Sequence, residues 1–239
     1  MSLIELHKVS RVYEMGETSI QALTDINLDI EQQTFASFVG PSGSGKTTLL
    51  NLIGCLDKPS TGEIKVNDVH VNEFNRKDAA VFRGTNIGFI FQNFNLLPVL
   101  TVYENVEYPL IMVQSLPEKE RRERVFKYLD AVGMTDQKNK YPSQISGGQK
   151  QRVAVARALV TDPKLVLADE PTANLDHKSA FRVIELMRQM QRELKTTFIF
   201  STHDPKIVKE AEIIYTLEDG KLVNKELMPT QNNHAKEIN

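Results

Sequence analysis

Eight consecutive residues have the types and the spacing of a phosphate-binding loop. They read Gly40-Pro41-Ser42-Gly43-Ser44-Gly45-Lys46-Thr47, which satisfies the pattern G-x-x-x-x-G-K-S/T. Glycines let backbone N–H groups turn inward around an anion, and a helix that starts at the loop adds the positive end of its dipole. We expect Lys46 to supply a cation for the β- and γ-phosphates and the Thr47 hydroxyl to bind Mg²⁺. The sequence therefore predicts a nucleotide site made of these residues together with Thr48.

Two carboxylates follow a later apolar run. Asp169 and Glu170 come directly after residues 165–168, which are all apolar. Sites of α/β proteins lie at the carboxyl ends of buried strands, so we expect Asp169 to hold Mg²⁺ and Glu170 to polarise the attacking water as general base. The alternative is an ordinary acidic turn after a strand, and the phosphate loop elsewhere in the chain disfavours it.

A second candidate anion site reads Ser146-Gly147-Gly148-Gln149. Two glycines beside a serine at a helix N-terminus can bind an anion, although the same residues also suit a flexible helix cap. A chain with one phosphate loop and one extra helix end of this kind favours a dimer. In that dimer each helix end would close on the nucleotide held by the partner's loop.

Apolar runs and turn residues predict the elements that position these residues. We expect strands at residues 3–14, 20–30, 35–40, 87–91, 165–169 and 197–201, helices at 46–54, 118–132, 146–161 and 179–194, a turn at 15–17 and a hairpin at 218–220. Strands and helices on both sides of a helical middle indicate a parallel-sheet α/β core with a helical insertion. The polar tail, residues 228–239, is expected to fray.

The composition agrees with a soluble globular protein. Of the 239 residues, 41% are hydrophobic and 25% are charged. The 29 Lys and Arg against 31 Asp and Glu give a net charge of −2, which disfavours a dedicated nucleic-acid binder. Cys55 is the only cysteine, so an internal disulfide and a cysteine-rich zinc site are excluded. We expect no membrane span and no signal peptide, and a cytoplasmic chain.

With these motifs the chain resembles the ATP-binding subunit of an ABC transporter over residues 3–227. The resemblance implies ATP and Mg²⁺ as cofactors and a P-loop (RecA-like) ATPase core with an N-terminal antiparallel β-subdomain and an inserted α-helical subdomain. It implies one domain at residues 1–227, with its core at 1–92 and 162–227, the helical subdomain at 93–161 and a tail at 228–239.

The same resemblance assigns roles to single residues. Tyr13 matches the aromatic that stacks on adenine, and Gln92 matches the Q-loop glutamine that touches Mg²⁺ and reports to the membrane partner. His203 matches the switch histidine near the γ-phosphate, residues 146–149 match the signature, and residues 174–176 match the D-loop. Taken singly, Tyr13 suits a sheet edge, Gln92 a solvated loop, and His203 the neighbourhood of a helix cap. The order of the motifs disfavours those readings.

Two residues differ from those that are usual in the family, and one residue is expected to have no catalytic role. Ile145 stands where leucine is common, and Asn174 stands where alanine or serine is frequent, which leaves the detailed dimer contacts of the D-loop open. Cys55 is expected to be a small buried residue on the helix after the phosphate loop.

Residues 92–110 and 53–59 are similar to the lipoprotein-releasing and macrolide-exporter ATPases. This implies a homodimer on ATP binding, a separate integral-membrane permease, and a peripheral place on the cytoplasmic face of the membrane. Phe94, Leu96, Leu97 and Val99 would form a docking groove for the permease, or else a stripe of the subdomain core. Two alternatives stay open: a cell-division ATPase that regulates wall hydrolysis, and a soluble ABC ATPase of DNA repair or translation. We expect no nucleic-acid partner.

Overall fold

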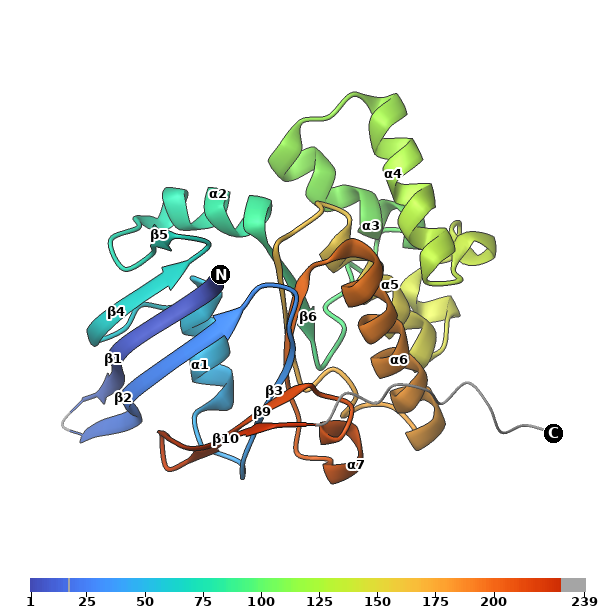
Figure 1. Cartoon of the computed structure of the whole chain (residues 1–239). Coiled ribbons are helices and arrows are strands. Elements are labelled where there is room, and N and C mark those ends of the chain that lie inside the picture. The colour runs from blue at the N-terminus through green and yellow to red at the C-terminus, as the bar shows by residue number, and fades with distance from the viewer. Residues whose placement is uncertain (17, 229–239) are drawn as a thin grey trace.

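The structure is a computed structural model that describes residues 1–16 and 18–228 of the chain. The predicted frayed tail lies outside the described residues except for Met228. Over the described part, none of the helices combines the length and the apolar character that crossing a bilayer requires. Two sheets, one helix between them and a group of helices beside the larger sheet make up the architecture (Figure 1).

The larger sheet has six strands in the order β10-β9-β3-β8-β7-β6. These are β3 (Phe35–Val39), β6 (Ile87–Phe91), β7 (Leu165–Asp169), β8 (Thr197–Ser201), β9 (Ile213–Glu218) and β10 (Lys221–Leu227). Strands β3, β6, β7, β8 and β9 are parallel, and β10 pairs antiparallel with β9 across the predicted hairpin. Short apolar runs suit a parallel sheet that is covered on both faces, so the predicted parallel core is confirmed.

The smaller sheet is antiparallel and has the order β2-β1-β4-β5. It contains β1 (Ser2–Met15), β2 (Thr18–Glu31), β4 (Thr61–Val66) and β5 (Val69–His70). In the second half of β2, buried and exposed residues alternate, because one face of the strand packs on the core and the other faces solvent. This is the expected N-terminal β-subdomain.

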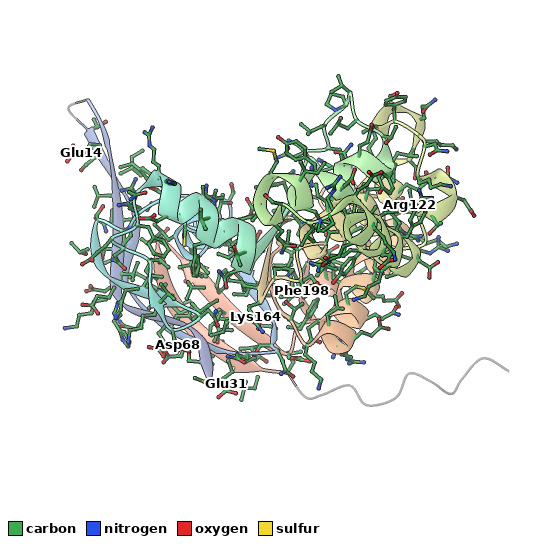
Figure 2. All side chains as sticks on the ribbon, turned by 90° about the horizontal axis from the view of Figure 1, so that it is seen from above. Glu14, Glu31, Asp68, Arg122, Lys164 and Phe198 are labelled. Atoms are coloured by element: carbon green, nitrogen blue, oxygen red, sulfur yellow. The ribbon has the colours of Figure 1, made fainter. Side chains whose placement is uncertain are left out.

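Alternate residues of the central strands enter two separate cores. In β8, Phe198 and Phe200 pack with the helical side of the molecule, whereas Ile199 packs with α1 (Lys46–Ile53) and the smaller sheet. Figure 1 places α1 between the two sheets. Figure 2 shows the antiparallel sheet near Glu14 and Asp68 at one end of the molecule and the helical segment near Arg122 at the other.

Most of the remaining chain is helical. The other helices are α2 (Arg76–Asn86), α3 (Val102–Pro109), α4 (Glu118–Ala131), α5 (Gly147–Leu159), α6 (His177–Leu194) and α7 (Pro205–Val208). A π-helical segment, Leu110–Gln114, continues α3, and 3-10 turns occupy Thr135–Gln137 and Pro142–Gln144. The predicted helices near α4, α5 and α6 are confirmed, while α2 and α3 were not predicted. The predicted subdomain boundaries at residues 92/93 and 161/162 stay predictions.

The parallel strands bring the predicted site residues to one edge of the sheet. Phe91 pairs with Asp169, and Phe38 pairs with Ser201, so β3, β6, β7 and β8 end at similar levels. The phosphate loop, Gln92 and Glu170 follow three of these strand ends directly. Segments far apart in the sequence therefore meet where sites of parallel sheets are found.

Candidate nucleotide site

The loop between β3 and α1 requires glycine at two positions. Gly40 has φ 148°, and a Cβ there would lie 2.1 Å from the carbonyl oxygen of Leu217. Gly45 has φ 101°, and a Cβ there would lie 2.7 Å from a methyl carbon of Leu23. Any other residue would be strained at both positions and would collide with neighbouring atoms. The fixed glycines of the motif thus have a steric cause in this fold.

The N-terminus of α1 faces the loop without a cap. Within the described residues, no side chain caps Gly45, the N-cap residue, and no acidic residue lies in the first turn. The N–H of Leu49 donates to the carbonyl oxygen of Gly45 at 2.8 Å, so the amides of Lys46, Thr47 and Thr48 precede the first intrahelical bond. These three N–H groups and the positive end of the helix dipole are suited to an anion.

A cavity of about 620 Å³ lies in front of this helix end, which is in the usual size range of ligand sites. Its lining residues are Ile20, Gln21, Ala22, Ser42, Gly43, Gly45, Lys46, Thr47, Thr48, Gln92, Glu170, Ala173 and His203. Most of the predicted loop, catalytic and Q-loop residues therefore share one cavity. Pro41, Ser44 and Asp169 lie next to lining residues in the chain and Gly40 lies two residues from one, but none of the four lines the cavity itself.

Lys46 is folded back against its own loop. Its ammonium group donates to the carbonyl oxygens of Gly40 and Pro41, both at 2.8 Å, and the residue is only 8% exposed. A lysine ammonium has three N–H donors, so one remains for a bound phosphate. The two carbonyls fix the position of this positive charge at the wall of the cavity.

A short chain of hydrogen bonds joins the loop to the ends of β7 and β8. The hydroxyl of Thr47 lies 3.1 and 3.0 Å from the two carboxylate oxygens of Asp169. The buried hydroxyl of Ser201 donates to Asp169 at 2.7 Å and accepts the N–H of Glu170 at 2.9 Å. Ser201 was not predicted, and it positions both acidic residues.

The carboxylate of Glu170 is paired with His203. Oε1 of Glu170 lies 3.0 Å from Nδ1 of His203. The side chain of Glu170 is 18% exposed and that of His203 is 70% exposed, so the carboxylate is sheltered and the ring reaches solvent. Glu170 has φ 46°, an unfavourable value for a non-glycine residue, and its N–H is held by Ser201. The fold therefore fixes the direction of this carboxylate, which can accept a proton from a water in the cavity.

Tyr13 lies beside the cavity and does not line it. Its hydroxyl donates to Asp57 at 2.8 Å, and the guanidinium carbon of Arg11 lies 4.4 Å from the centre of its ring. Tyr13 pairs across the sheet with Ile20, which does line the cavity. Its predicted stacking on adenine stays a prediction.

The Q-loop and the D-loop are joined by one side chain. Nδ2 of Asn174 donates to the backbone carbonyl of Gln92 at 3.0 Å and to Oδ1 of Asn93 at 2.8 Å. Asp176, two residues later, caps α6 by accepting the N–H of Ser179 at 3.0 Å. The bonds to Gln92 and Asn93 on one side and the cap of α6 on the other fix the position of Asn174. Its side chain connects the segment after β6 with the segment after β7.

The signature residues surround a separate cavity of about 280 Å³. Ser146, Gly148, Gln149, Arg152, Ser179, Arg182 and Val183 line it, and none of these residues lines the cavity at the phosphate loop. The hydroxyl of Ser146 accepts the N–H of Gln149 at 3.3 Å as the N-cap of α5, which leaves its O–H free to donate. Within the described chain, the two predicted halves of the nucleotide site are therefore not brought together.

A sequence profile of the ABC transporter family matches residues 23–173, more than half of the chain. The chain belongs to the ABC transporter family. The predicted fold class and the predicted ATPase activity of this family are confirmed. ATP is therefore the nucleotide that this chain binds and hydrolyses.

Two relatives and one solved structure illustrate the similarity. The chain is 42% identical over 227 residues to the ABC transporter ATP-binding protein MJ0796 of Methanocaldococcus jannaschii, covering 94% of this chain and 97% of the relative. It is 42% identical over 221 residues to the macrolide export ATP-binding/permease protein MacB 1/2 of Paracoccus denitrificans, covering 92% of this chain and 33% of that protein. A dimeric post-hydrolysis structure of the MJ0796 cassette with ADP and Pi superposes with a TM-score of 0.87 at 41% identity, covering 95% and 99% of the two chains.

In this ABC cassette, helix α5 holds the segment that follows the Q-loop glutamine. The guanidinium of Arg157, on α5, donates to the backbone carbonyls of Asn95 at 2.5 Å and Phe94 at 2.8 Å. Phe94 and Asn95 have φ 61° and 48°, so these bonds stabilise an unfavourable backbone. Burial lowers the pKa of Arg157 to about 10, and the group still carries its positive charge at neutral pH.

A groove lies beside this segment, and other residues than those predicted to dock the permease line it. A cavity of about 280 Å³ is lined by Gly84, Ile87, Gly88, Phe89, Phe91, Asn95, Pro109, Val113, Arg157, Ala158 and Thr161. None of the predicted residues Phe94, Leu96, Leu97 and Val99 lines it. Leu96 packs against the core, while Val99 is 79% exposed. The position of Leu96 agrees with the alternative of a subdomain core stripe, and docking of the permease on the four predicted residues stays a prediction.

Sequence reasoning also missed lining residues of the ABC nucleotide cavity. Ile20, Gln21 and Ala22 come from β2, and Ala173 comes from the D-loop side. No motif contains the β2 residues, and they reach the cavity only because β2 passes the loop at Gly45.

Proposed function

We propose that this chain is the ATP-hydrolysing subunit of an ABC transporter complex and works as an ATP-dependent homodimer on a separate membrane permease. The observation that carries the proposal is the sheltered Glu170 carboxylate at the phosphate loop cavity, which contacts His203 while Ser201 holds the backbone N–H of the same residue. A nucleotide site without such a base would bind ATP and release it unchanged. A site with this base can activate a water next to the terminal phosphate.

The proposed nucleotide contacts follow from the loop geometry. The uncapped amides of Lys46, Thr47 and Thr48 and the lysine ammonium would hold the β- and γ-phosphates. These donors also stabilise the charge that develops on the transferred phosphoryl group, at a rigid loop that needs little rearrangement. Tyr13, next to Ile20 at the cavity wall, would carry the adenine after its ring moves relative to Arg11.

The residues also suit Mg²⁺ as the second cofactor. Thr47 and Asp169 offer a hydroxyl and a carboxylate within hydrogen-bond distance of one another, and Gln92 lines the same cavity. Within the described residues no cluster of three or more His, Cys, Asp or Glu side chains forms a metal site. Mg²⁺ typically takes one or two protein oxygens and completes its shell with water and substrate phosphates, so this donor set fits. The ion would neutralise phosphate charge during transfer.

The proposed catalytic steps use Glu170, His203 and Lys46. Glu170 accepts the proton of the attacking water, which lies in line with the phosphorus and the leaving oxygen. His203 orients Glu170 through the 3.0 Å contact, and its other ring nitrogen would be left for the γ-phosphate. Lys46 and the loop amides bind the phosphoryl oxygens throughout.

A second copy would complete the site. The signature cavity holds Ser146 with a free O–H donor, a helix N-terminus, and the guanidinium groups of Arg152 and Arg182. These groups suit a second anion, and their cavity shares no lining residue with the phosphate loop cavity of the same chain. The dimeric structure of the related cassette supports the proposal that the partner's signature closes on this nucleotide.

A permease partner is supported by the groove and by a relative. The groove between β6, α3 and α5 combines Phe89, Phe91 and Val113 with the Arg157 charge, and its wall includes Asn95 of the Q-loop segment. The macrolide exporter relative carries its ATP-binding and permease parts in one chain. We propose a peripheral position on the cytoplasmic face of the membrane, with Gln92 passing nucleotide occupancy to the docked permease.

The substrate class is proposed from the similarity to lipoprotein-releasing and macrolide-exporting ATPases. The alternatives are a cell-division ATPase that controls wall hydrolysis without transport and a soluble ABC ATPase of DNA repair or translation. The test is to purify the chain with its bound partners from solubilised membranes and to reconstitute the complex in vesicles. Recovery of a permease, with ATP-dependent movement of a lipoprotein or macrolide, is the expected result. A chain found only in the soluble fraction with nucleic acid would refute the proposal.

A further inference from the structure

A second large cavity lies at the other end of α1, away from the phosphate loop. Its volume is about 420 Å³, within the range of small-molecule sites. It is bounded by the loop after α1, the segment after β5 and helix α2, and it shares no lining residue with the nucleotide cavity. The lining residues are Cys55, Leu56, Asp57, Lys58, Val71, Phe74, Asn75, Arg76, Ala79 and Arg83.

The floor of this cavity is apolar. Val71 is 6% exposed and Cys55 is 8% exposed, so both present only a small surface to the cavity. The ring of Phe74 packs on that of Phe82 with centroids 5.2 Å apart, which fixes the orientation of an aromatic wall. Ala79, one turn into α2, adds a small apolar side chain. An apolar group of matching size would be desolvated here.

The rim carries an excess of positive charge. Arg83 is anchored by a 2.7 Å hydrogen bond to the carbonyl oxygen of Cys55, which leaves further N–H donors of its guanidinium. The side chains of Lys58 and Arg76 are exposed, and within the described residues neither has a hydrogen-bond or ion-pair partner. Three cations thus converge on a cavity with one lining carboxylate.

That carboxylate is already engaged. Asp57 forms an ion pair with Arg11 at 2.9 Å and accepts the hydroxyl hydrogen of Tyr13 at 2.8 Å. The N-terminus of α2 lies at the same rim and is already satisfied, because the side chain of Asn75 accepts the N–H groups of Lys77 and Asp78, and Asp78 does not line the cavity. The cationic groups therefore have no carboxylate of this chain to neutralise them inside the cavity.

We propose that this cavity binds a small organic anion, with a carboxylate or phosphate group between Lys58, Arg76 and Arg83 and an apolar body on Phe74 and Val71. Arginine forks match the geometry of both anionic groups. The site is independent of ATP chemistry, because the two cavities are separate. It is nonetheless connected to it, since Asp57 lines the cavity and holds Tyr13, the predicted adenine contact.

The test uses the full chain saturated with ADP, so that the phosphate loop is blocked. Binding of 4-fluorobenzoate and of 4-fluorophenyl phosphate is followed by ligand-observed ¹⁹F NMR, with 4-fluorobenzyl alcohol as the uncharged comparison. We expect saturable binding of at least one anion in the millimolar range or tighter, and about tenfold weaker binding of the alcohol. Absence of saturable binding by both anions up to about 10 mM would overturn the proposal.

Variants locate the site. Arg76→Gln and Lys58→Gln remove charges that have no partner in the described chain, so the fold should tolerate them. Each should raise the Kd of the anion about tenfold. Lys77→Gln, also in the first turn of α2 but outside the cavity lining, is the matched control and should leave the Kd unchanged. Equal effects of Lys77→Gln and Arg76→Gln would show non-specific charge attraction and would reject the site.

A second readout does not depend on the variants. Cys55 is the only cysteine of the chain and lines the cavity, so its alkylation by iodoacetamide reports on occupancy through intact mass. The bound anion should slow alkylation several-fold, and excess ADP alone should not. Unchanged alkylation at saturating anion would contradict binding in this cavity. Failure of either readout would leave the ATPase proposal unaffected, because neither measures ATP hydrolysis.

Discussion

Oε1 of Glu170 lies 3.0 Å from Nδ1 of His203, although the two residues follow different strands. Glu170 comes directly after β7, and His203 comes two residues after the end of β8. The strands are neighbours in the parallel sheet, and Ser201 at the end of β8 holds the N–H of Glu170. The pairing of the two strands therefore fixes both the position of the carboxylate and its partner.

Replacing the carboxylate separates binding from hydrolysis. Glu170→Gln keeps the size and most hydrogen bonds of the side chain but cannot accept the proton of water. We expect kcat for ATP hydrolysis to fall by about two to four orders of magnitude, while the Kd for ATP changes little. Phosphate release and equilibrium nucleotide binding measure the two quantities. Normal hydrolysis by this variant would show that Glu170 is not the base.

The Asn174 contacts predict a positioning effect. Asn174→Ala removes the bonds to the carbonyl of Gln92 and to Asn93, and we expect kcat to fall about five- to tenfold, which corresponds to about 1 kcal/mol. Asn174→Asp, which replaces the donor by an acceptor facing two oxygens, should be at least as harmful. The Tm should change little, because these bonds are exposed. A variant with full kcat and a lowered Tm would indicate a purely structural role.

Asn105 predicts a large effect on stability instead. Its fully buried side chain accepts the N–H of Leu97 at 2.8 Å and donates to the carbonyl oxygens of Leu97, Leu100 and Thr101 at 2.9 to 3.1 Å. Asn105→Ala would leave the N–H of Leu97 and the carbonyl oxygen of Leu100 without these partners and lower the free energy of unfolding by about 2–4 kcal/mol. Urea unfolding measures this loss. Asn224→Ala, at an exposed strand position, is the control and should cost less than about 0.5 kcal/mol.

We expect folding stability and the alkylation of Cys55 to depend on pH. Burial, only partly offset by Arg83, raises the pKa of Cys55 from 9.0 to about 11. The folded chain therefore keeps this proton longer than the unfolded chain does. The associated stability is complete below pH 9.0 and is lost as the pH rises through about 11. Alkylation of the native protein should accelerate with a midpoint near pH 11, against about 9 in urea. Identical midpoints in both states would contradict the burial of the thiol.

Much of the core could be predicted from the sequence because its strands are short, apolar and bounded by turn residues. The helix Lys46–Ile53 and the strand Leu165–Asp169 were predicted to within a residue. Helix α2 was missed because its apolar contact with the core is narrow: Ala79 and Phe82 pack against the core, and none of its residues is fully buried. Helix α3 begins with a capping box at Thr101 and Glu104, a readable signal that was not used. Cys55 lies just beyond α1, not on it, with φ 54° after the helix ends at Gly54.

The site shows a similar division. The roles of Lys46, Asp169 and Glu170 could be predicted from sequence motifs, because phosphate binding and water activation require those residue types at that spacing. Ser201 could not be found in this way, since its role arises only when β8 lies beside β7. The joining of the signature to the phosphate loop was inferred as an event between two copies, and the separate cavities agree with that inference.

The measurement that tests the account most directly is the ATP-dependent association of Glu170→Gln. Analytical ultracentrifugation with ATP and Mg²⁺ should show a dimer, which returns to monomer with ADP. Adding Ser146→Arg to the same variant should abolish the dimer while ATP still binds, because only the signature cavity is filled. A Glu170→Gln chain that binds ATP and stays monomeric, or one in which Ser146→Arg abolishes ATP binding by the monomer, would contradict the proposed site shared between two copies.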